Sequence, residues 1–237
     1  MNISLPCPVQ SINSSSQPCR VNSANCFGDK PIRLLVLLLT VLVLATACSK
    51  AKEQAIPPAS IVLALGDSLT EGAGVSREEA WPNLLASRTG WVVINGGVSG
   101  DTSEGALQRL PSLLEKHKPV LVLVALGGND MLRHLPEQET VANLEKIITL
   151  IRTHDAKPVL LATPQPSIAG AVFQHLSAAD FYQQIADTQK VPLIKDALAD
   201  VISQPQLKGD PLHPNAAGHA LLSEKIYTEL KSFGYIR

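Results

Sequence analysis

The sequence has no cysteine after Cys48 and no run of lysine or arginine. Its four cysteines all lie in the first 48 residues: Cys7, Cys19, Cys26 and Cys48. The remainder therefore forms no disulfides, uses no thiolate nucleophile and builds no cysteine metal site, so its stability depends on its core alone. The formal net charge is −1. Without a basic patch, nothing in the chain indicates a nucleic-acid partner.

Several well-known motifs are also missing. The chain contains no P-loop, no His-Glu-x-x-His zinc motif and no complete Gly-x-Gly-x-x-Gly fingerprint, because Gly72 and Gly74 lack the third glycine. These absences argue against metal and dinucleotide sites, and we expect neither a metal nor a cofactor. The Gly-x-Ser-x-Gly elbow is absent too, so the usual α/β-hydrolase nucleophile is not the right comparison.

The first 48 residues differ in composition from the rest. Residues 1–29 are rich in Ser, Asn, Cys and Pro without helix or strand period, which predicts a disordered or mis-assigned N-terminal extension. Residues 30–47 combine positive charges, an apolar stretch and small residues, as a secretory signal peptide does. The apolar stretch is shorter than the roughly 20 residues of a spanning helix. We therefore expect export.

The sequence Ala-Thr-Ala-Cys at 45–48 resembles the bacterial lipoprotein cleavage box, although Ala45 stands where leucine is commoner. By this resemblance Cys48 is the lipidation site, and the membrane is a partner through an N-terminal lipid anchor in the periplasm or at the outer membrane. Plain secretion is the alternative. Residues 49–59 read as a polar tether, and residues 60–237 as one domain, expected to be a monomer.

From residue 60 onwards, apolar runs of strand length alternate with segments of helical period. The predicted strands are residues 60–66, 91–95, 119–128, 157–163 and 191–194. The predicted helices are residues 77–90, 101–117, 136–154, 177–189, 196–203 and 215–234. This alternation predicts the α/β class, as a three-layer α/β/α arrangement around a five-stranded parallel sheet.

Local signals refine the helix at 101–117. It opens on an Asp-x-x-Glu capping pattern at Asp101, and Pro111 predicts a kink or a break within it. Asp67 and Asp130 stand beside other polar turns. We interpret all three aspartates as turn or helix caps.

Glycine-rich polar turns follow the first three predicted strands, at residues 66–68, 95–101 and 127–130. Carboxyl ends of parallel strands meet at one edge of a sheet, where ligands bind in such folds, so these turns should cluster there. Ser68 in the first turn is then a candidate nucleophile. It needs a base, and the base needs an orienting acid.

His213 is the candidate base. His117 and His154 end helices, where a cation suits the dipole. The other three are interpreted as two loop residues and a helix-interior residue: His134, His175 and His219. Asp210 precedes His213 by three positions, so a turn can bring its carboxylate onto one ring nitrogen and leave the other for serine. An ordinary turn capped by Asp explains this segment equally well.

Four ordered blocks resemble the SGNH (GDSL) hydrolase family: GDSL at 66–69, SGDTS at 99–103, GGND at 127–130 and DPLHPN at 210–215. The resemblance covers about residues 60–230 and is closest to the bacterial thioesterase/lysophospholipase/arylesterase subgroup. It implies the flavodoxin-like SGNH hydrolase fold.

The resemblance also implies roles for particular residues. Ser68 is the nucleophile, His213 the base and Asp210 the third member of the triad. The oxyanion hole consists of the Ser68 and Gly100 N–H groups and the Asn129 side-chain amide. Glycine lets its N–H approach an oxyanion closely, and asparagine donates without carrying charge.

These features predict an exported serine esterase that hydrolyses carboxylic esters or thioesters through an acyl-enzyme on Ser68. The expected substrate is a small acyl ester or a lysophospholipid. The alternative is a carbohydrate O-acetyl esterase acting on envelope or external glycans, although Trp81 and Trp91 are the only tryptophans for a sugar-binding cleft. A third reading is a non-catalytic surface lipoprotein.

Residues 163–180 depart from the subgroup and should overhang the active edge, where they would set substrate preference.

Overall fold

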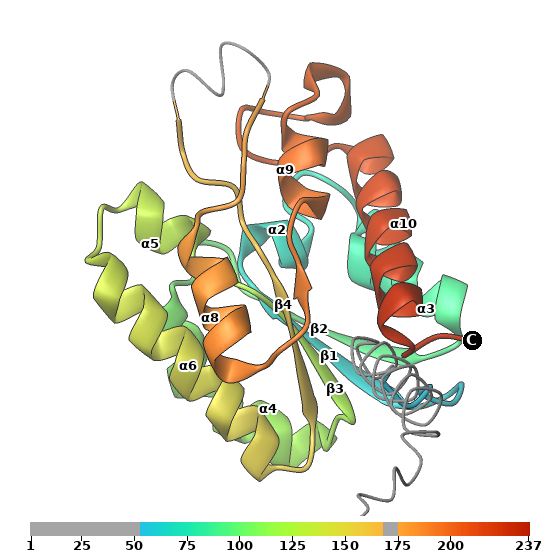
Figure 1. Ribbon diagram of the computed structural model, residues 1–237. Helices are drawn as coiled ribbons and strands as arrows, with labels where there is room; N and C mark the ends of the chain where they lie inside the picture. Colours follow the sequence, from blue (N-terminus) through green and yellow to red (C-terminus); the bar gives the residue numbers. More distant parts are fainter. Residues whose placement is uncertain (1–52, 168–174) are drawn as a thin grey trace, which may run out of the picture. The chain divides into compact units, whose positions relative to one another are not determined.

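A computed structural model describes residues 53–167 and 175–237. The expectations for the N-terminal extension, the signal peptide, Cys48 and residues 49–52 of the tether lie outside the described residues. The described residues form a five-stranded sheet with helices on both faces (Figure 1). The α/β class and the three-layer arrangement are thereby confirmed.

The five strands are all parallel and follow the order β2-β1-β3-β4-β5. Their bounds are β1 Ile61–Gly66, β2 Val92–Gly97, β3 Leu121–Ala125, β4 Lys157–Leu161 and β5 Leu193–Ile194. This is the flavodoxin-like strand order, in which β1 and β3 flank the switch point. Gly66 at the end of β1 lies opposite Gly97 of β2 and Ala125 of β3. The three polar turns therefore start level with one another.

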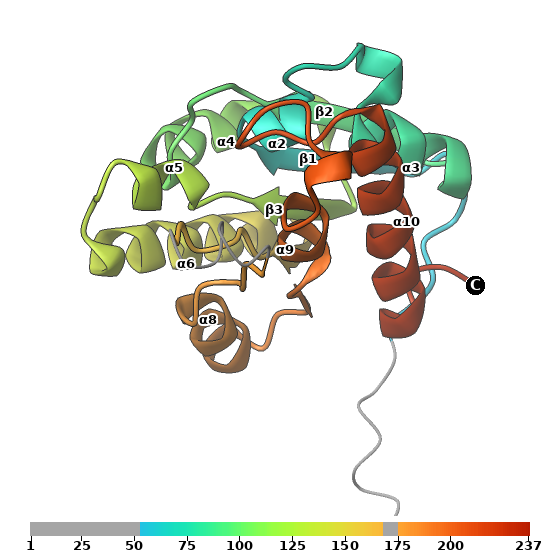
Figure 2. The same ribbon diagram turned by 90° about the horizontal axis from the view of Figure 1, so that it is seen from above.

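Helices α4 (Ser103–His117), α6 (Glu137–Thr153) and α8 (Phe181–Gln189) cover one face of the sheet. Helices α3 (Trp81–Thr89), α9 (Ala197–Ile202) and α10 (Ala216–Phe233) cover the other (Figures 1 and 2). Because side chains alternate along a strand, Leu63 and Leu65 pack under the first group and Val62 under the second. Every residue of β3 is buried, as expected for a central parallel strand.

Two short helices that the sequence did not predict begin within the predicted polar turns and extend beyond them. They are α2 (Ser68–Glu71) after β1 and α5 (Gly128–Leu132) after β3. Single turns of 3-10 helix also occur at Arg77–Glu79 and Pro205–Leu207. A single helical turn is too short to show an apolar period, so the sequence pattern carries no signal for it.

Helix α4 differs from the expectations at two positions: Asp101 is not its cap, and the break given as one of the two outcomes at Pro111 does not occur. Its N-cap is Thr102, whose side chain accepts the N–H of Gly105, whereas Asp101 forms an ion pair with Arg109. The helix is also not broken at Pro111, because it continues to His117. Leucines on both sides of the proline are buried against the sheet, and this packing offsets the missing hydrogen bond.

The described part of the predicted tether packs on the domain. The N–H groups of Glu53 and Ile56 donate to the carbonyls of Phe233 and Tyr235 at 2.8 and 2.9 Å. The Glu53 carboxylate also accepts from Lys157 Nζ at 2.6 Å. Lys157 is the first residue of β4, so this contact lies at the amino ends of the strands, opposite the three polar turns.

Candidate active site

Ser68 is the first residue of α2, directly beyond the end of β1. Asp67 is the N-cap of this helix: its Oδ1 accepts the N–H of Leu69 at 3.0 Å. The cap prediction for Asp67 is thus confirmed. A first-turn N–H has no partner within its own helix, and the N–H of Ser68 donates to no other described residue.

The hydroxyl of Ser68 lies 3.0 Å from Nε2 of His213, although 145 positions separate the two residues. On the other side of the imidazole, Nδ1 lies 2.7 Å from Oδ2 of Asp210. An ionised carboxylate only accepts, so Nδ1 carries the proton it donates, and Nε2 of the neutral ring is left to accept from the Ser68 hydroxyl. The sequence-predicted pairing of these three side chains is present in the geometry.

The loop before α10 holds the Asp210 carboxylate in place. Its Oδ1 accepts the N–H groups of Leu212 and His213 at 2.7 and 2.9 Å, so the turn-cap reading of this segment is also correct. The hydrogen bond from His213, followed by that from Leu212, lowers the pKa of Asp210 to about 2. The carboxylate is therefore ionised throughout the neutral range.

The turn after β2 brings Gly100 to the same edge of the sheet. Gly100 has φ 77°, a left-handed conformation that favours glycine. Its carbonyl accepts from Arg133 Nη2 at 2.6 Å, while its N–H donates to no other described residue. Two backbone N–H groups, those of Ser68 and Gly100, are thus uncommitted at the cavity that both residues line.

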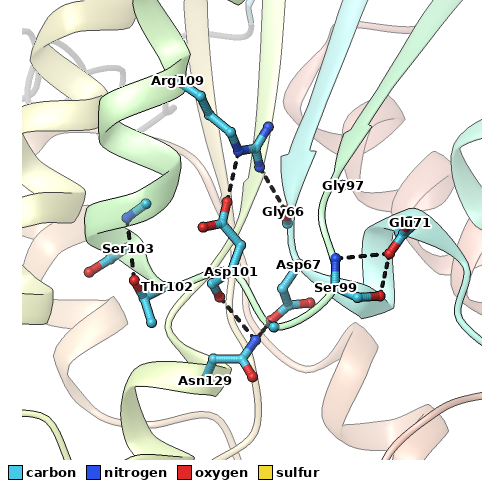
Figure 3. Close-up of polar contacts among 12 residues, drawn as sticks. Gly66, Asp67, Glu71, Gly97, Ser99, Asp101, Thr102, Ser103, Arg109 and Asn129 are labelled. Carbon is cyan, nitrogen blue, oxygen red and sulfur yellow. Dashed lines mark hydrogen bonds and ion pairs between the residues drawn. The ribbon is translucent and has the colours of Figure 1, made fainter.

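Asn129 projects from α5, and its side-chain amide donates twice. Nδ2 lies 2.9 Å from the carbonyl oxygen of Asp101 and 3.2 Å from Oδ2 of Asp67 (Figure 3). An amide NH₂ has two hydrogens, so both are engaged in this arrangement. Asn129 lies at the cavity as expected, but it donates to a third acceptor only by giving up or sharing one of these bonds.

Asp67 therefore has a second partner besides the helix cap. Its side chain is buried, and burial raises its pKa to about 6, against the lowering effects of the Leu69 N–H and of charge on His213. The sequence predicts only the cap role of Asp67. A carboxylate flanked by a helix N-terminus and an amide, with its partner 62 positions away, has no local sequence signature.

A cavity of about 510 Å³ opens beside Ser68 and His213. Its lining surface is mostly apolar and includes six aliphatic side chains: Leu69, Ala73, Leu132, Leu176, Ile202 and Leu212. Thr163, Pro164 and Gln165, which follow β4, line it too, so this part of the 163–180 segment lies at the active edge as expected. Residues 168–174 lie outside the described residues. Both tryptophan side chains are buried, with exposed fractions of 0 and 4%, and neither lines this cavity.

Other candidate residues are placed elsewhere. His219 is buried in α10, where its Nδ1 accepts the backbone N–H of Trp81 at 3.4 Å. Burial lowers the pKa of His219 to about 4. Asp130 is a buried residue of α5 but does not cap that helix, whose N-cap is Gly127; its carboxylate accepts the N–H and the hydroxyl of Ser103, the first residue of α4. Within the described residues, no group of three or more His, Cys, Asp or Glu side chains is arranged as a metal site. The same part of the chain has no helix with the length and apolar character of a membrane span.

The fold and the polar residues at its edge match a known class of hydrolase. The profile of the GDSL-like lipase/acylhydrolase family matches residues 64–221. An arylesterase of Vibrio mimicus is 37% identical over 205 residues, which cover 84% of this chain and 98% of that protein. Thioesterase 1/protease 1/lysophospholipase L1 of Escherichia coli (strain K12) is 36% identical over 178 residues, covering 73% and 84%.

A solved structure agrees with these relatives. The psychrotrophic esterase EstA from Pseudoalteromonas sp., inhibited by monoethylphosphonate, superimposes with a TM-score of 0.65 at 31% identity, covering 73% of this chain and 98% of EstA. The chain belongs to the GDSL-like lipase/acylhydrolase family, the SGNH hydrolases, and it is an ester hydrolase. The family resemblance drawn from the four sequence blocks is confirmed.

Proposed function

We propose that this chain is an exported serine esterase that works through an acyl-enzyme on Ser68. His213 Nε2 takes the hydroxyl proton as Oγ attacks the acyl carbonyl, and the imidazolium then gives that proton to the departing alkoxide or thiolate. Water then attacks the acyl carbon while the same nitrogen takes its proton; the bond from the acyl carbon to Ser68 Oγ breaks, Oγ receives that proton from the imidazolium, and the acid is released. Asp210 holds the imidazole and stabilises its charged form. The observation that carries this proposal is the Ser68–His213–Asp210 contact chain at 3.0 and 2.7 Å.

In the tetrahedral intermediates, the oxygen anion is held by the N–H groups of Ser68 and Gly100, neither of which has another described partner. Asn129 is the third donor. Its hydrogen bond to Asp67 is longer than its hydrogen bond to Asp101, 3.2 against 2.9 Å. We therefore assign the hydrogen that points to Asp67 as the one that is donated to the oxyanion instead.

The cavity supports an acyl chain as the group that is recognised. Its aliphatic walls would bury the methylenes of a small or medium acyl ester or of a lysophospholipid, at roughly 0.8 kcal/mol for each buried CH₂. A glycan O-acetyl esterase would instead gain from exposed aromatic side chains, and both tryptophans are buried. We therefore favour the acyl ester over the acetylated glycan.

Export and lipid anchoring through Cys48 rest on the leader sequence. The test is to express the full chain in a Gram-negative host and follow it through Triton X-114 phase separation. The expected result is that the protein partitions into the detergent phase and that Cys48→Ala moves it to the aqueous phase. Equal partitioning of the two proteins would overturn the anchor but not the esterase activity.

The esterase proposal is tested on p-nitrophenyl esters of increasing chain length and on acetylated xylan, with Ser68→Ala beside the wild-type enzyme. We expect a preference for acyl chains longer than acetate, covalent labelling of the wild type by a fluorophosphonate, and neither turnover nor labelling in Ser68→Ala. Folded, unlabelled wild-type protein would support the non-catalytic reading. Activity confined to acetylated xylan would support the glycan esterase.

A further inference from the structure

The last residue of α2 reaches across to the turn that carries Gly100. Oε2 of Glu71 accepts the N–H of Ser99 at 2.8 Å and also accepts the Ser99 hydroxyl (Figure 3). Ser99 directly precedes Gly100 and also lines the cavity. One carboxylate oxygen therefore joins the short helix that begins with the nucleophile to the turn with the uncommitted N–H.

The backbone of Glu71 is fixed before its side chain makes this contact. A Cβ on Gly97 would lie 2.1 Å from the Glu71 nitrogen, so a glycine is required where the end of β2 packs against α2. Asn95 Nδ2, also from β2, donates to the Glu71 carbonyl at 3.2 Å. The carboxylate thus acts from a rigid base, which makes it suitable for positioning a neighbouring peptide.

The hydrogen bonds around Gly100 hold the peptide units on both sides of its own N–H. The preceding unit is held through the Ser99 N–H, which donates to Glu71, and the following unit through the Gly100 carbonyl, which accepts from Arg133. The intervening Gly100 N–H has no partner among the described residues. Its direction is therefore set by the two contacts that flank it.

We propose that Glu71 is a positioning residue that aims the Gly100 N–H at the oxygen anion formed on Ser68. The proposal rests on the esterase mechanism above, and Glu71 itself touches no reacting atom. Its benefit comes from accepting hydrogen bonds and not from its charge, since a carboxylate near an oxyanion opposes that charge. Glu71 is exposed, so water screens most of this opposition.

The chain contains a matched control. Glu79 Oε2 accepts the N–H and the hydroxyl of Ser76 at 3.0 and 2.9 Å, the same pair of contacts, in a segment that does not line the cavity. Glu71→Ala and Glu79→Ala therefore remove chemically equivalent contacts at different places. Glu71→Gln keeps one acceptor oxygen, and a single oxygen already makes both bonds in the structure.

The experiment measures kcat and KM for p-nitrophenyl butyrate and the inhibition constant for a phenylboronic acid, whose serine adduct places an oxygen in the oxyanion hole. For Glu71→Ala we expect kcat to fall about tenfold or more with little change in KM, since small misplacements at a reacting centre are costly. The boronate inhibition constant should rise in parallel. Glu71→Gln should recover most of kcat, and Glu79→Ala should match the wild type.

Fluorophosphonate titration gives the concentration of active sites, so a loss of folded enzyme is separated from a loss of rate per site. The proposal is overturned if Glu71→Ala and Glu79→Ala have equal kcat per active site, or if the boronate binds Glu71→Ala as tightly as wild type. Full activity in Ser68→Ala would instead overturn the esterase mechanism. The two failures are therefore distinguishable.

Discussion

The side-chain amide of Asn129 lies 3.2 Å from Oδ2 of Asp67, across the ends of β3 and β1. The other oxygen of the same carboxylate caps α2 at the Leu69 N–H. The buried Asp67 carboxylate therefore connects the start of the helix that carries Ser68 with the Asn129 amide assigned to the oxyanion hole. This relationship gives separate expectations for the two residues.

Replacing Asn129 by Ala should lower kcat on p-nitrophenyl butyrate about 10²–10³-fold, the usual cost of losing one oxyanion donor. KM should change little, because the donor acts on the charge of the transition state. Asn143→Ala is a suitable control, because Asn143 contacts Ser103 and does not line the cavity. A loss in Asn129→Ala no greater than that in the control would exclude Asn129 from the oxyanion hole.

Asp67 should make stability depend on pH. Its pKa is about 6 in the folded chain, against about 3.9 when unfolded, so the folded state binds the proton more tightly. The stabilisation from protonated Asp67 is complete below about pH 4 and is lost as the pH rises through 6. Asp67→Asn stays neutral, and nearby His213 and Asp101 are present in both proteins.

The unfolding free energy of Asp67→Asn, relative to wild type, should therefore increase between pH 4 and pH 8, by on the order of 3 kcal/mol for a shift of about two pKa units. Urea unfolding at both pH values measures this difference. A difference that stays constant with pH would mean that Asp67 is already ionised at pH 4 in the folded protein.

Replacing Asp210 by Asn should reduce kcat on p-nitrophenyl butyrate by up to about 10⁴-fold, because Nδ1 of His213 loses an ionised acceptor. Asp210 itself does not titrate between pH 5 and pH 9, because its pKa is about 2, so its charge in the wild-type enzyme is constant over that range. His213→Ala should lose nearly all turnover. His134→Ala, outside the cavity lining, should retain it; comparable losses in the two histidine variants would contradict the assignment of the base.

Ile202 at the end of α9 lies in the cavity wall and is 5% exposed. Ile202→Trp should fill part of the cavity and shift the preferred p-nitrophenyl ester to a shorter acyl chain, with activity on the acetate kept. Leu135→Trp, at a residue that is 40% exposed and outside the cavity lining, is the control. An unchanged chain-length profile in Ile202→Trp would show that the acyl group binds elsewhere.

The sequence alone predicts the strand-helix alternation well, because runs such as β3 are apolar throughout and α6 has a clear helical period. It also places Ser68, Gly100 and Asn129 at one edge, since each follows a strand of the same parallel sheet. These inferences depend only on local composition and on the rule that parallel strands end together.

The connections between these residues are not predictable in the same way. The contacts of Asp67 with Asn129 and of Glu71 with Ser99 join positions far apart in the chain, and they depend on side-chain directions that no periodicity encodes. The Asp101 cap prediction is wrong for a similar reason: Arg109, eight positions further along the chain, forms an ion pair with this carboxylate in place of the helix N-terminus.

The docking of Glu53 at the amino ends of the strands has a consequence for how an anchored enzyme would meet its substrate. From Cys48 to Glu53 a fully extended chain reaches only about 17 Å. If Cys48 is acylated as proposed, Glu53 lies within that reach of the bilayer, whereas Ser68 and its cavity lie at the opposite ends of the strands. An anchor at this end leaves the cavity open to esters that arrive from the aqueous compartment.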